Sequence, residues 1–456
     1  MLTEKKSWRF GVLSSAGAGH LNPLIALSQE LKRRGHTAVF FDRPKIEARV
    51  RDAGLEFFPI GPPGRTNLES PRCNTPGIRH EIALLRSNLA RMTRDLGHYL
   101  EKTPPALAAA GVDALLVDEI ALTGPTIAQL MRLPYFLLST SIPHRLGWKS
   151  SSWLTGYRSS ETALSWLRGP LLEVSALRMR GPLLKALNQL RRDAGLGPLR
   201  LLSSQHRSLA HLTQWPQCLD ARRKAVPTDL FYSGPWLSDG RRQSVQFPWH
   251  RLDGRPVAYV TLGTTRNAQP ETYRMIAEAC SDPGLDLQLV IALGDRFDSA
   301  MFDDLPGRPV VVRYAPQLEL LKVAKLVIAH GGCNTSLEAL LEGKPMVVIP
   351  LAYDQPAIAA RLHRVGAAEV VPVMRLSADG IREAVTKVLN EPRYRLAAEG
   401  LRPKLAQLDG AKRAADIIAL EMEGYAARQR VEAQAALSAA PDLAQAAAAP
   451  SSYHSH

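Results

Sequence analysis

The chain has 456 residues, which is too many for a single hydrophobic core and predicts two or three domains. With 45% hydrophobic and 22% charged residues it has the composition of a soluble globular protein, and its apolar runs are only strand-sized, which excludes a membrane-spanning protein. The net charge of +14 is compatible with a nucleic-acid partner. However, the sequence has no RNP motif, zinc-finger spacing or Lys/Arg tail, so we expect no nucleic acid to bind.

The first residues and the cysteines indicate the compartment. The N-terminal MLTEKKSWRF has neither the hydrophobic region nor the cleavage site of a secretory signal. Cys73, Cys218, Cys280 and Cys333 show no C-x-x-C spacing and no disulfide framework. We therefore expect a cytoplasmic protein without a zinc site.

The beginning of the chain predicts an α/β domain. FGVLSS at 10–15 indicates a strand, and AGAGH at 16–20 indicates a turn of small residues. Residues 23–34 form an amphipathic pattern that ends in basic residues and Gly35, as helices commonly do. The segment 37–41 indicates the next strand.

The same region also imitates a dinucleotide-binding fingerprint. Gly17-x-Gly19 with Asp42 downstream would make the protein an NAD- or FAD-dependent oxidoreductase. The third glycine of that fingerprint lets the helix pack closely on the strand, and here its position holds Asn22. The oxidoreductase is kept as an alternative from a different class.

The middle of the chain contains a basic region. Between Ser141 and Arg200, ten Lys and Arg residues stand against three Asp and Glu residues, giving +7, and Trp148, Trp153 and Trp166 are interleaved among them. This combination suits an anionic membrane surface or a lipophilic ligand. Amphipathic helices with solvated arginines produce the same pattern and remain the alternative.

Further strands indicate a second α/β domain. DALLVD at 113–118 predicts another strand of the first sheet, with Asp118 at its carboxyl end. Residues 236–255 are polar and contain Gly and Pro, which favours an interdomain linker. Beyond the linker, strands are expected at 257–262, 288–293 and 310–314.

The most informative stretch is HGGCNTSLEALLEGKPMVVIPLAYDQ at 330–355. A strand at 326–329 precedes it, a glycine pair lets the backbone turn and approach a ligand, and Asn334 or Thr335 is expected to cap the helix that follows. Residues 346–350 return as the next strand. A helix start of this kind, with unpaired N–H groups and a positive dipole end, binds phosphate.

Three polar residues of this stretch suit a nucleotide sugar. Glu338 lies one helical turn after Thr335, and Asp354 and Gln355 lie just past the second strand, where open α/β sheets bind ligands. A carboxylate can accept hydrogen bonds from two ribose hydroxyls, and an Asp–Gln pair suits a second polyol. Thr335 and Glu338 also fit a capping box, in which Glu338 only satisfies the helix start.

The stretch resembles the donor-binding signature of family 1 UDP-glycosyltransferases, H-x-G-x-N-[ST]-x-x-E followed by G-x-P and D-Q. YAPQ at 314–317 is similar to the opening W-x-P-Q of that signature, with Tyr314 in place of the Trp that stacks on uracil. GHLNP at 19–23 and RGH at 34–36 resemble the N-terminal turn of the family. Gly263-Thr264-Thr265 resembles its phosphate contact.

The resemblance implies a GT-B fold, an α/β protein with two Rossmann-like domains facing each other across a cleft. It implies His20 as the catalytic base and Asp118 as the residue that orients it. The residues implied in donor binding are Thr264, Tyr314, Gln317, His330, Gly332, Asn334, Thr335, Glu338, Asp354 and Gln355. The expected units are an acceptor-binding domain at 1–235, a linker at 236–255, a nucleotide-sugar-binding domain at 256–408, a C-terminal helix at 409–430 and a disordered tail at 431–456.

The implied activity is inverting transfer of a hexose, expected to be glucose, from a UDP-sugar co-substrate, with no other cofactor. No D-x-D pair occurs in the chain, so we expect no metal at the diphosphate. Residues 354–362 resemble bacterial zeaxanthin glucosyltransferases, which implies a lipophilic hydroxylated acceptor such as a carotenoid. From the basic region between Ser141 and Arg200 we expect peripheral contact with the inner face of an anionic membrane. The alternatives are a macrolide, polyphenol or sterol acceptor, and a nucleotide-sugar-binding protein without activity.

Overall fold

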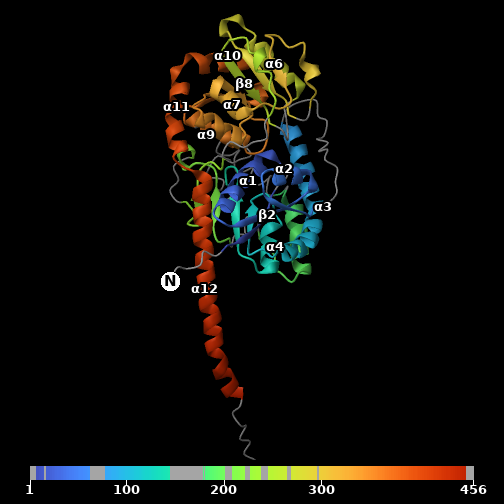
Figure 1. Cartoon of the computed structure of the whole chain (residues 1–456). Helices are drawn as coiled ribbons and strands as arrows, with labels where there is room; N and C mark the ends of the chain where they lie inside the picture. The colour runs from blue at the N-terminus through green and yellow to red at the C-terminus, as the bar shows by residue number, and fades with distance from the viewer. Residues whose placement is uncertain are drawn as a thin grey trace, which may run out of the picture.

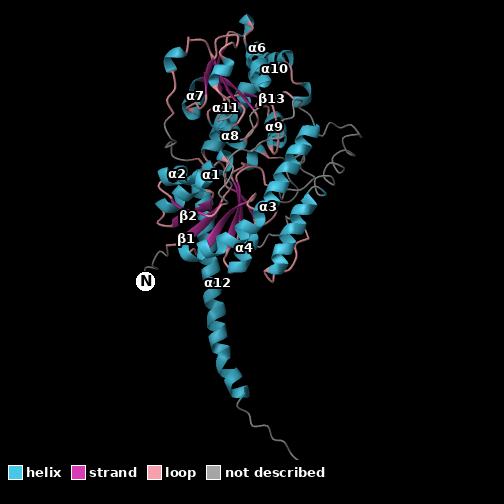
Figure 2. Cartoon of the chain, turned by 90° about the vertical axis from the view of Figure 1, so that its right-hand side faces the viewer, coloured by secondary structure: helices cyan, strands magenta, loops and turns pink. Residues whose placement is uncertain are grey.

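The computed structural model describes residues 7–14, 17–61, 78–143, 178, 180–200, 208–220, 226–237, 245–263, 269–294 and 297–447. Two α/β halves lie end to end, and the last helix runs along the N-terminal half and beyond it (Figure 1). Figure 2 shows the same two halves from the side. None of the described helices is long and apolar enough to cross a membrane.

Seven parallel strands form the sheet of the N-terminal half, in the order β3-β2-β1-β4-β5-β6-β7. Successive side chains of a strand point to opposite faces, so Phe40 packs against α1 while Phe41 packs against α3 and α4. The strands are β1 (Arg9–Leu13), β2 (Thr37–Asp42), β3 (Glu56–Pro59), β4 (Ala114–Asp118), β5 (Tyr135–Ser139), β6 (His211–Thr213) and β7 (Leu230–Tyr232), and the helices are α1 (Ala18–Arg33), α2 (Glu47–Asp52), α3 (Ile78–Ala110) and α4 (Gly124–Met131).

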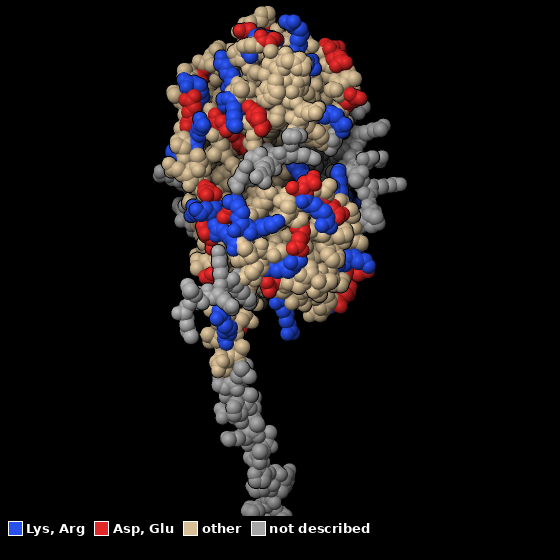
Figure 3. Space-filling view, in the orientation of Figure 1, with Lys and Arg blue, Asp and Glu red and all other residues tan. Residues whose placement is uncertain are grey.

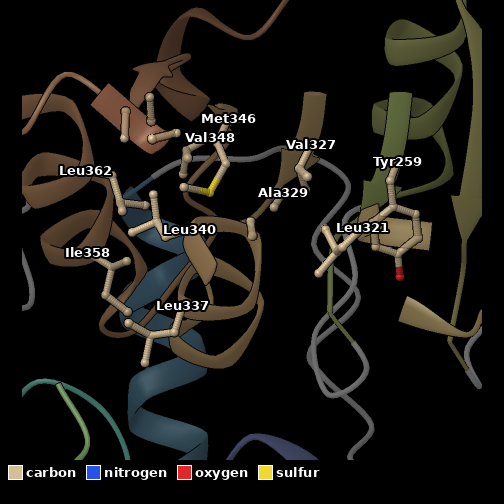
Figure 4. Packing of buried hydrophobic residues seen from close by; sticks show 14 of the residues in the cluster. Tyr259, Leu321, Val327, Ala329, Leu337, Leu340, Met346, Val348, Ile358 and Leu362 are labelled. Atoms are coloured by element: carbon tan, nitrogen blue, oxygen red, sulfur yellow. The ribbon is translucent and has the colours of Figure 1, made fainter. Parts of the chain in front are cut away.

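Six parallel strands form the second sheet, in the order β10-β9-β8-β11-β12-β13. Figure 4 shows one of its faces, where Leu337 and Leu340 of α8 pack near Val348 and Ile358. The strands are β8 (Val257–Thr261), β9 (Gln288–Ala292), β10 (Val310–Val312), β11 (Ala324–Ala329), β12 (Met346–Val348) and β13 (Ala368–Val370), and the helices are α6 (Pro270–Cys280), α7 (Gln317–Val323), α8 (Cys333–Leu341), α9 (Gln355–Arg364), α10 (Ala378–Asn390) and α11 (Pro392–Ala406).

Helix α12 (Gly410–Ala447) returns from the second sheet to the first. Its residues Ala414, Ile418 and Met422 are buried in the core cluster that α1 and the N-terminal sheet form. Trp236, the first residue of the predicted linker, is buried in the same cluster. A side chain at Gly410 would collide with the backbone of Gly234, so the return of the chain requires a glycine there.

The C-terminal prediction was wrong in one respect. The sequence predicted a helix that ends at 430 and a disordered tail at 431–456, whereas α12 continues to Ala447. The segment after 430 is rich in Ala, the strongest helix former, and its low complexity was taken as a sign of disorder. Residues 448–456 lie outside the described residues.

The start of the first helix was also predicted wrongly. The sequence placed a turn at 16–20 and began the helix at Pro23, the residue type favoured at the first helical position. In the structure α1 begins at Ala18 and contains Pro23, so His20 lies in the first turn of a helix. The strands predicted at 37–41, 113–118, 257–262, 288–293, 310–314 and 326–329 are confirmed to within two residues.

The two halves share a buried contact between the β6–β7 connection and α9. Trp215 and Leu219 from the N-terminal half belong to the hydrophobic core of the second sheet. Beside them, the Arg361 guanidinium donates to Asp220 at 2.9 Å, and these side chains are 2% and 1% exposed. The Tyr232 hydroxyl also donates to Asp220, at 2.8 Å. The relative position of the halves is therefore fixed by both apolar packing and a desolvated ion pair.

Removal of one partner of this ion pair should destabilise the fold strongly, because it leaves the other charge buried. We expect Arg361→Leu to lower the free energy of unfolding by about 3–5 kcal/mol. Arg395→Ala is the matched control, since its pair with Glu399 is exposed and worth about 0–1 kcal/mol. Denaturant unfolding checks both variants, and equal losses would contradict the assignment of Asp220 and Arg361 as the structural pair.

Candidate active site

His20 and Asp118 meet at the carboxyl edge of the N-terminal sheet. His20 lies in the first turn of α1, just after β1, and Asp118 ends the neighbouring strand β4. The Nδ1 atom of His20 lies 2.8 Å from Oδ2 of Asp118, whose side chain is 1% exposed. Because a carboxylate oxygen accepts, the proton belongs on Nδ1, which leaves Nε2 as an acceptor on a side chain that is 30% exposed.

Thr140 also contacts the imidazole, and the sequence reasoning missed it. Its hydroxyl oxygen lies 2.7 Å from Nδ1 of His20, directly after the end of β5. The sequence held a signal for Thr140, because the run Ser139-Thr140-Ser141 places hydroxyl side chains at the end of a buried strand. The carboxyl end of that strand lies at the same sheet edge as Asp118.

The pKa of His20 is raised above its ordinary value. Burial lowers the pKa, but the charge of Asp118 and the hydrogen bond to it raise it, and Asp354 and Glu119 add to the rise. Asp354 belongs to the other half of the molecule, so the basicity of His20 depends on how the halves are joined.

Asp42 does not have the surroundings of a ribose ligand. It ends β2 and is 2% exposed, and its carboxylate accepts from the Ser14 hydroxyl and the Arg43 N–H, both at 2.7 Å. Burial raises the pKa of Asp42 to about 6. Both carboxylate oxygens of Asp42, the residue that completed the dinucleotide-like pattern, therefore accept hydrogen bonds from neighbours at the edge of the N-terminal sheet.

His330 is held between two glycines at the carboxyl end of the second sheet. A side chain at Gly332 would approach the imidazole within 2.5 Å, and one at Gly263 within 2.9 Å. Nδ1 of His330 lies 3.4 Å from the carbonyl oxygen of Thr261. Burial lowers the pKa of His330, which favours the neutral ring, with its proton on Nδ1 toward the Thr261 carbonyl and with Nε2 as an acceptor.

The predicted cap of α8 was wrong. The N-cap is Gly332 and makes no side-chain cap, while Asn334 and Thr335 lie inside the first turn. The Asn334 amide instead donates to the Gly19 carbonyl at 3.0 Å and accepts from Gln214 at 2.9 Å, so both bonds cross to the N-terminal half. The first N–H groups of α8 remain without side-chain caps and point toward the space between the halves.

Glu338 is not a capping residue. It is 2% exposed, and its Oε2 accepts from the Gln317 amide at 2.6 Å. The oxygen of the same amide accepts from the Tyr259 hydroxyl at 3.2 Å, so Gln317 is held with its N–H₂ toward Glu338. Tyr314, three residues before Gln317, is 43% exposed.

Asp354 and Gln355 differ in their surroundings. Asp354 accepts a hydrogen bond from the Ser141 hydroxyl across the two halves. The side-chain oxygen of Gln355 accepts from the N–H groups of Leu351 and Ala352, at 2.8 and 2.9 Å, so only its N–H₂ group can be offered to a ligand. Tyr353 before them has φ +59°, an uncommon conformation for an aromatic residue, and it marks this loop as strained.

Eleven of the twelve predicted residues, together with Thr140, lie at or after the carboxyl ends of strands in the two sheets. Thr264 lies outside the described residues. Within the described ranges, no cluster of three His, Cys, Asp or Glu residues could hold a metal ion. Asn334 and Asp354 reach the N-terminal half through their bonds with Gln214 and Ser141.

Two Rossmann-like sheets with facing carboxyl edges define the GT-B fold. Residues 252–401 match the model of UDP-glucoronosyl and UDP-glucosyl transferases, and residues 12–116 match the glycosyltransferase family 28 N-terminal domain. The chain superimposes on a crystal structure of the glycotransferase of kitacinnamycin with a TM-score of 0.72 and 24% identity, covering 91% of this chain and 99% of that one.

Curated relatives agree with these matches. The zeaxanthin glucosyltransferase of Pantoea ananas is 26% identical and covers 78% of this chain and 83% of its own length. The oleandomycin glycosyltransferase of Streptomyces antibioticus is 26% identical and covers 94% of both chains. Together with the fold, these comparisons support a glycosyltransferase that takes its sugar from a nucleotide sugar.

The pKa of His20 provides a test that needs no substrate. Asp118→Asn removes the charge that raises this pKa and leaves the burial that lowers it, so the pKa should fall. NMR titration of the His20 imidazole measures it, with Asp416→Asn, an exposed carboxylate on α12, as the control. An unchanged His20 pKa in Asp118→Asn would contradict the electrostatic role of Asp118.

Proposed function

We propose that the protein transfers a hexose, expected to be glucose, from a UDP-sugar to a hydroxyl of a lipophilic acceptor, with inversion and without a metal ion. The observation that supports this most is the 2.8 Å contact of His20 with Asp118. This pair lies opposite the start of α8, where Asn334 donates to the carbonyl of Gly19, the residue before His20. A base on one half and an anion-binding helix start on the other are the two groups that this transfer needs.

The proposed reaction moves one proton and exchanges one bond. Nε2 of His20 takes the proton of the acceptor hydroxyl, and the oxygen forms a bond to the anomeric carbon as the bond from that carbon to the UDP oxygen breaks. Asp118 stabilises the imidazolium that results. Attack from the face opposite UDP converts an α-linked donor into a β-glycoside, and the departing diphosphate is stabilised by the N–H groups of the first turn of α8.

The proposed donor contacts come from side chains that follow the strands of the second sheet. Glu338, oriented by Gln317, would accept the ribose hydroxyls, and the exposed ring of Tyr314 would lie against the uracil. Asp354 would accept sugar hydroxyls in place of Ser141, and Gln355 would donate through its N–H₂ group. His330 and Thr264 are retained as predicted donor-binding residues, Thr264 as a phosphate contact.

The proposed acceptor is a hydroxylated carotenoid such as zeaxanthin. Its support is the similarity to zeaxanthin glucosyltransferases, first seen around Asp354 and Gln355. A macrolide is the second candidate, because the oleandomycin glycosyltransferase covers a larger share of this chain. Much of the region from Ser141 to Arg200, which would line the acceptor site, lies outside the described residues.

The proposed membrane contact concerns the basic residues of that region. Arg191 cannot contribute, because it is 4% exposed and donates to Gly197, Thr126 and Gln129. Lys185 and Arg192 on the same helix are exposed. Basic side chains also gather on the N-terminal half beside α12 (Figure 3), which is the half proposed to bind the acceptor. Their attraction to anionic lipid would bring the site to its acceptor.

Loss of the Glu338 charge should weaken donor binding without unfolding the protein. Glu338→Gln keeps the shape of the buried side chain, and we expect the Kd for UDP to rise about 10–100-fold, the worth of a hydrogen bond to a charged group. Calorimetric titration of UDP checks this, with Glu342→Gln at the far end of α8 as the control. Unchanged affinity in Glu338→Gln would exclude the ribose assignment.

The transfer itself is tested with UDP-glucose, in parallel reactions with and without EDTA, and with zeaxanthin, a flavonoid and a macrolide as separate acceptors. We expect a zeaxanthin β-glucoside by mass spectrometry and NMR, and a rate about 10²–10⁴-fold lower in His20→Ala. Zeaxanthin is supplied in anionic and in zwitterionic liposomes, and the anionic ones should give the higher rate at low salt. A glucosylated macrolide with unchanged zeaxanthin would select the second acceptor, and activity that EDTA abolishes would exclude the metal-free mechanism.

A further inference from the structure

The carbonyl of Gly19 has an unusual partner. In an α-helix this oxygen accepts from the N–H of the residue four positions later, which here is Pro23 and has no N–H. The Asn334 amide donates to it instead, at 3.0 Å, from the first turn of α8. A proline inside α1 therefore leaves a backbone acceptor that the other half of the molecule uses.

This bond closes a ring of contacts around His20. Asn334 accepts from Gln214 at 2.9 Å, and Gln214, which is 1% exposed, also donates to the carbonyl of Thr140. The Thr140 hydroxyl lies 2.7 Å from Nδ1 of His20, and His20 follows Gly19 in the chain. The imidazole is thus held from two sides, and both connections pass through Asn334.

We propose that Pro23 is a positioning residue, which keeps the Gly19 carbonyl available to Asn334 and so fixes His20 relative to the helix start that faces the donor. This inference rests on the proposed function, in which His20 takes a proton from the acceptor. Pro23 touches neither substrate and acts through the backbone of α1. The ring of a helical proline also displaces the carbonyl four residues earlier, which turns the Gly19 oxygen outward toward α8.

An alanine at this position would reverse the arrangement. Its N–H would donate to the Gly19 carbonyl within α1, straighten the first turns, and compete with Asn334 for the same oxygen. The helix gains a hydrogen bond while the link between the halves weakens. Stability and activity should therefore change in opposite directions, which a purely structural role of Pro23 would not produce.

The test compares Pro23→Ala with Pro403→Ala, which removes an exposed proline from the interior of α11, away from the site, whereas Pro23 is buried. We expect Pro23→Ala to keep or raise the Tm, to lower kcat about 10–100-fold, the cost of a small displacement of a reacting group, and to leave the KM for UDP-glucose within about twofold. Pro403→Ala should retain wild-type kcat.

A double-mutant cycle with Asn334→Ala identifies the bond itself. If Pro23 acts through Asn334, the second substitution should add little to the loss of kcat already caused by the first. Unchanged kcat in Pro23→Ala, a loss of kcat that follows a fall in Tm, or additive losses in the cycle would each overturn the inference.

Failure of the positioning role of Pro23 can be distinguished from failure of the proposed function. If the wild-type protein glucosylates no acceptor, the proposed function fails, and the NMR shifts of the His20 imidazole then decide the role of Pro23. A change of those shifts in Pro23→Ala, with Pro403→Ala like the wild type, supports the positioning role. Identical shifts in all three proteins overturn it.

Discussion

The hydrogen bond from Asn334 to the Gly19 carbonyl is the contact on which the candidate site depends. Each sheet by itself places useful groups at its carboxyl edge: His20 and Asp118 on one, and the start of α8 on the other. The proposed inverting transfer needs both edges, because it places the base and the leaving group on opposite sides of one carbon atom. A short polar residue that reaches across is the simplest way to set that separation.

A second contact between the halves has a different physical character. The pair of Asp220 and Arg361 is desolvated and enclosed by Trp215 and Leu219, so opening it would expose two charges and a hydrophobic surface. The bonds of Asn334 and Asp354 lie nearer to the exposed His20 ring and are exchangeable with hydroxyls or water. Motion between the halves should therefore pivot about α9 and open on the side of His20.

The sequence was sufficient for elements whose signal is local. The buried strands were found from apolar runs. The pairing of His20 with Asp118 was implied by the resemblance to family 1 UDP-glycosyltransferases, and the two side chains are in contact because parallel strands bring their carboxyl ends to one edge. The start of α1 and the cap of α8 were missed for the same reason. One hydrogen bond explains both: the Asn334 amide donates to the Gly19 carbonyl of α1 instead of capping α8, and no local pattern around Pro23 or Asn334 reports a partner that is some 300 positions away in the chain.

Asp354 connects the two halves electrostatically as well as by hydrogen bonding. It belongs to the C-terminal half, yet its charge helps to raise the pKa of His20 in the N-terminal half. Ser141 donates to the same carboxylate from the N-terminal half, at the point where the proposed function places a sugar hydroxyl of the donor. A sugar that replaced Ser141 would keep this charge hydrogen-bonded, so the field at His20 would persist when the donor is bound, whereas separation of the halves would weaken it. The basicity of His20 is therefore a property of the joined halves rather than of the N-terminal sheet alone.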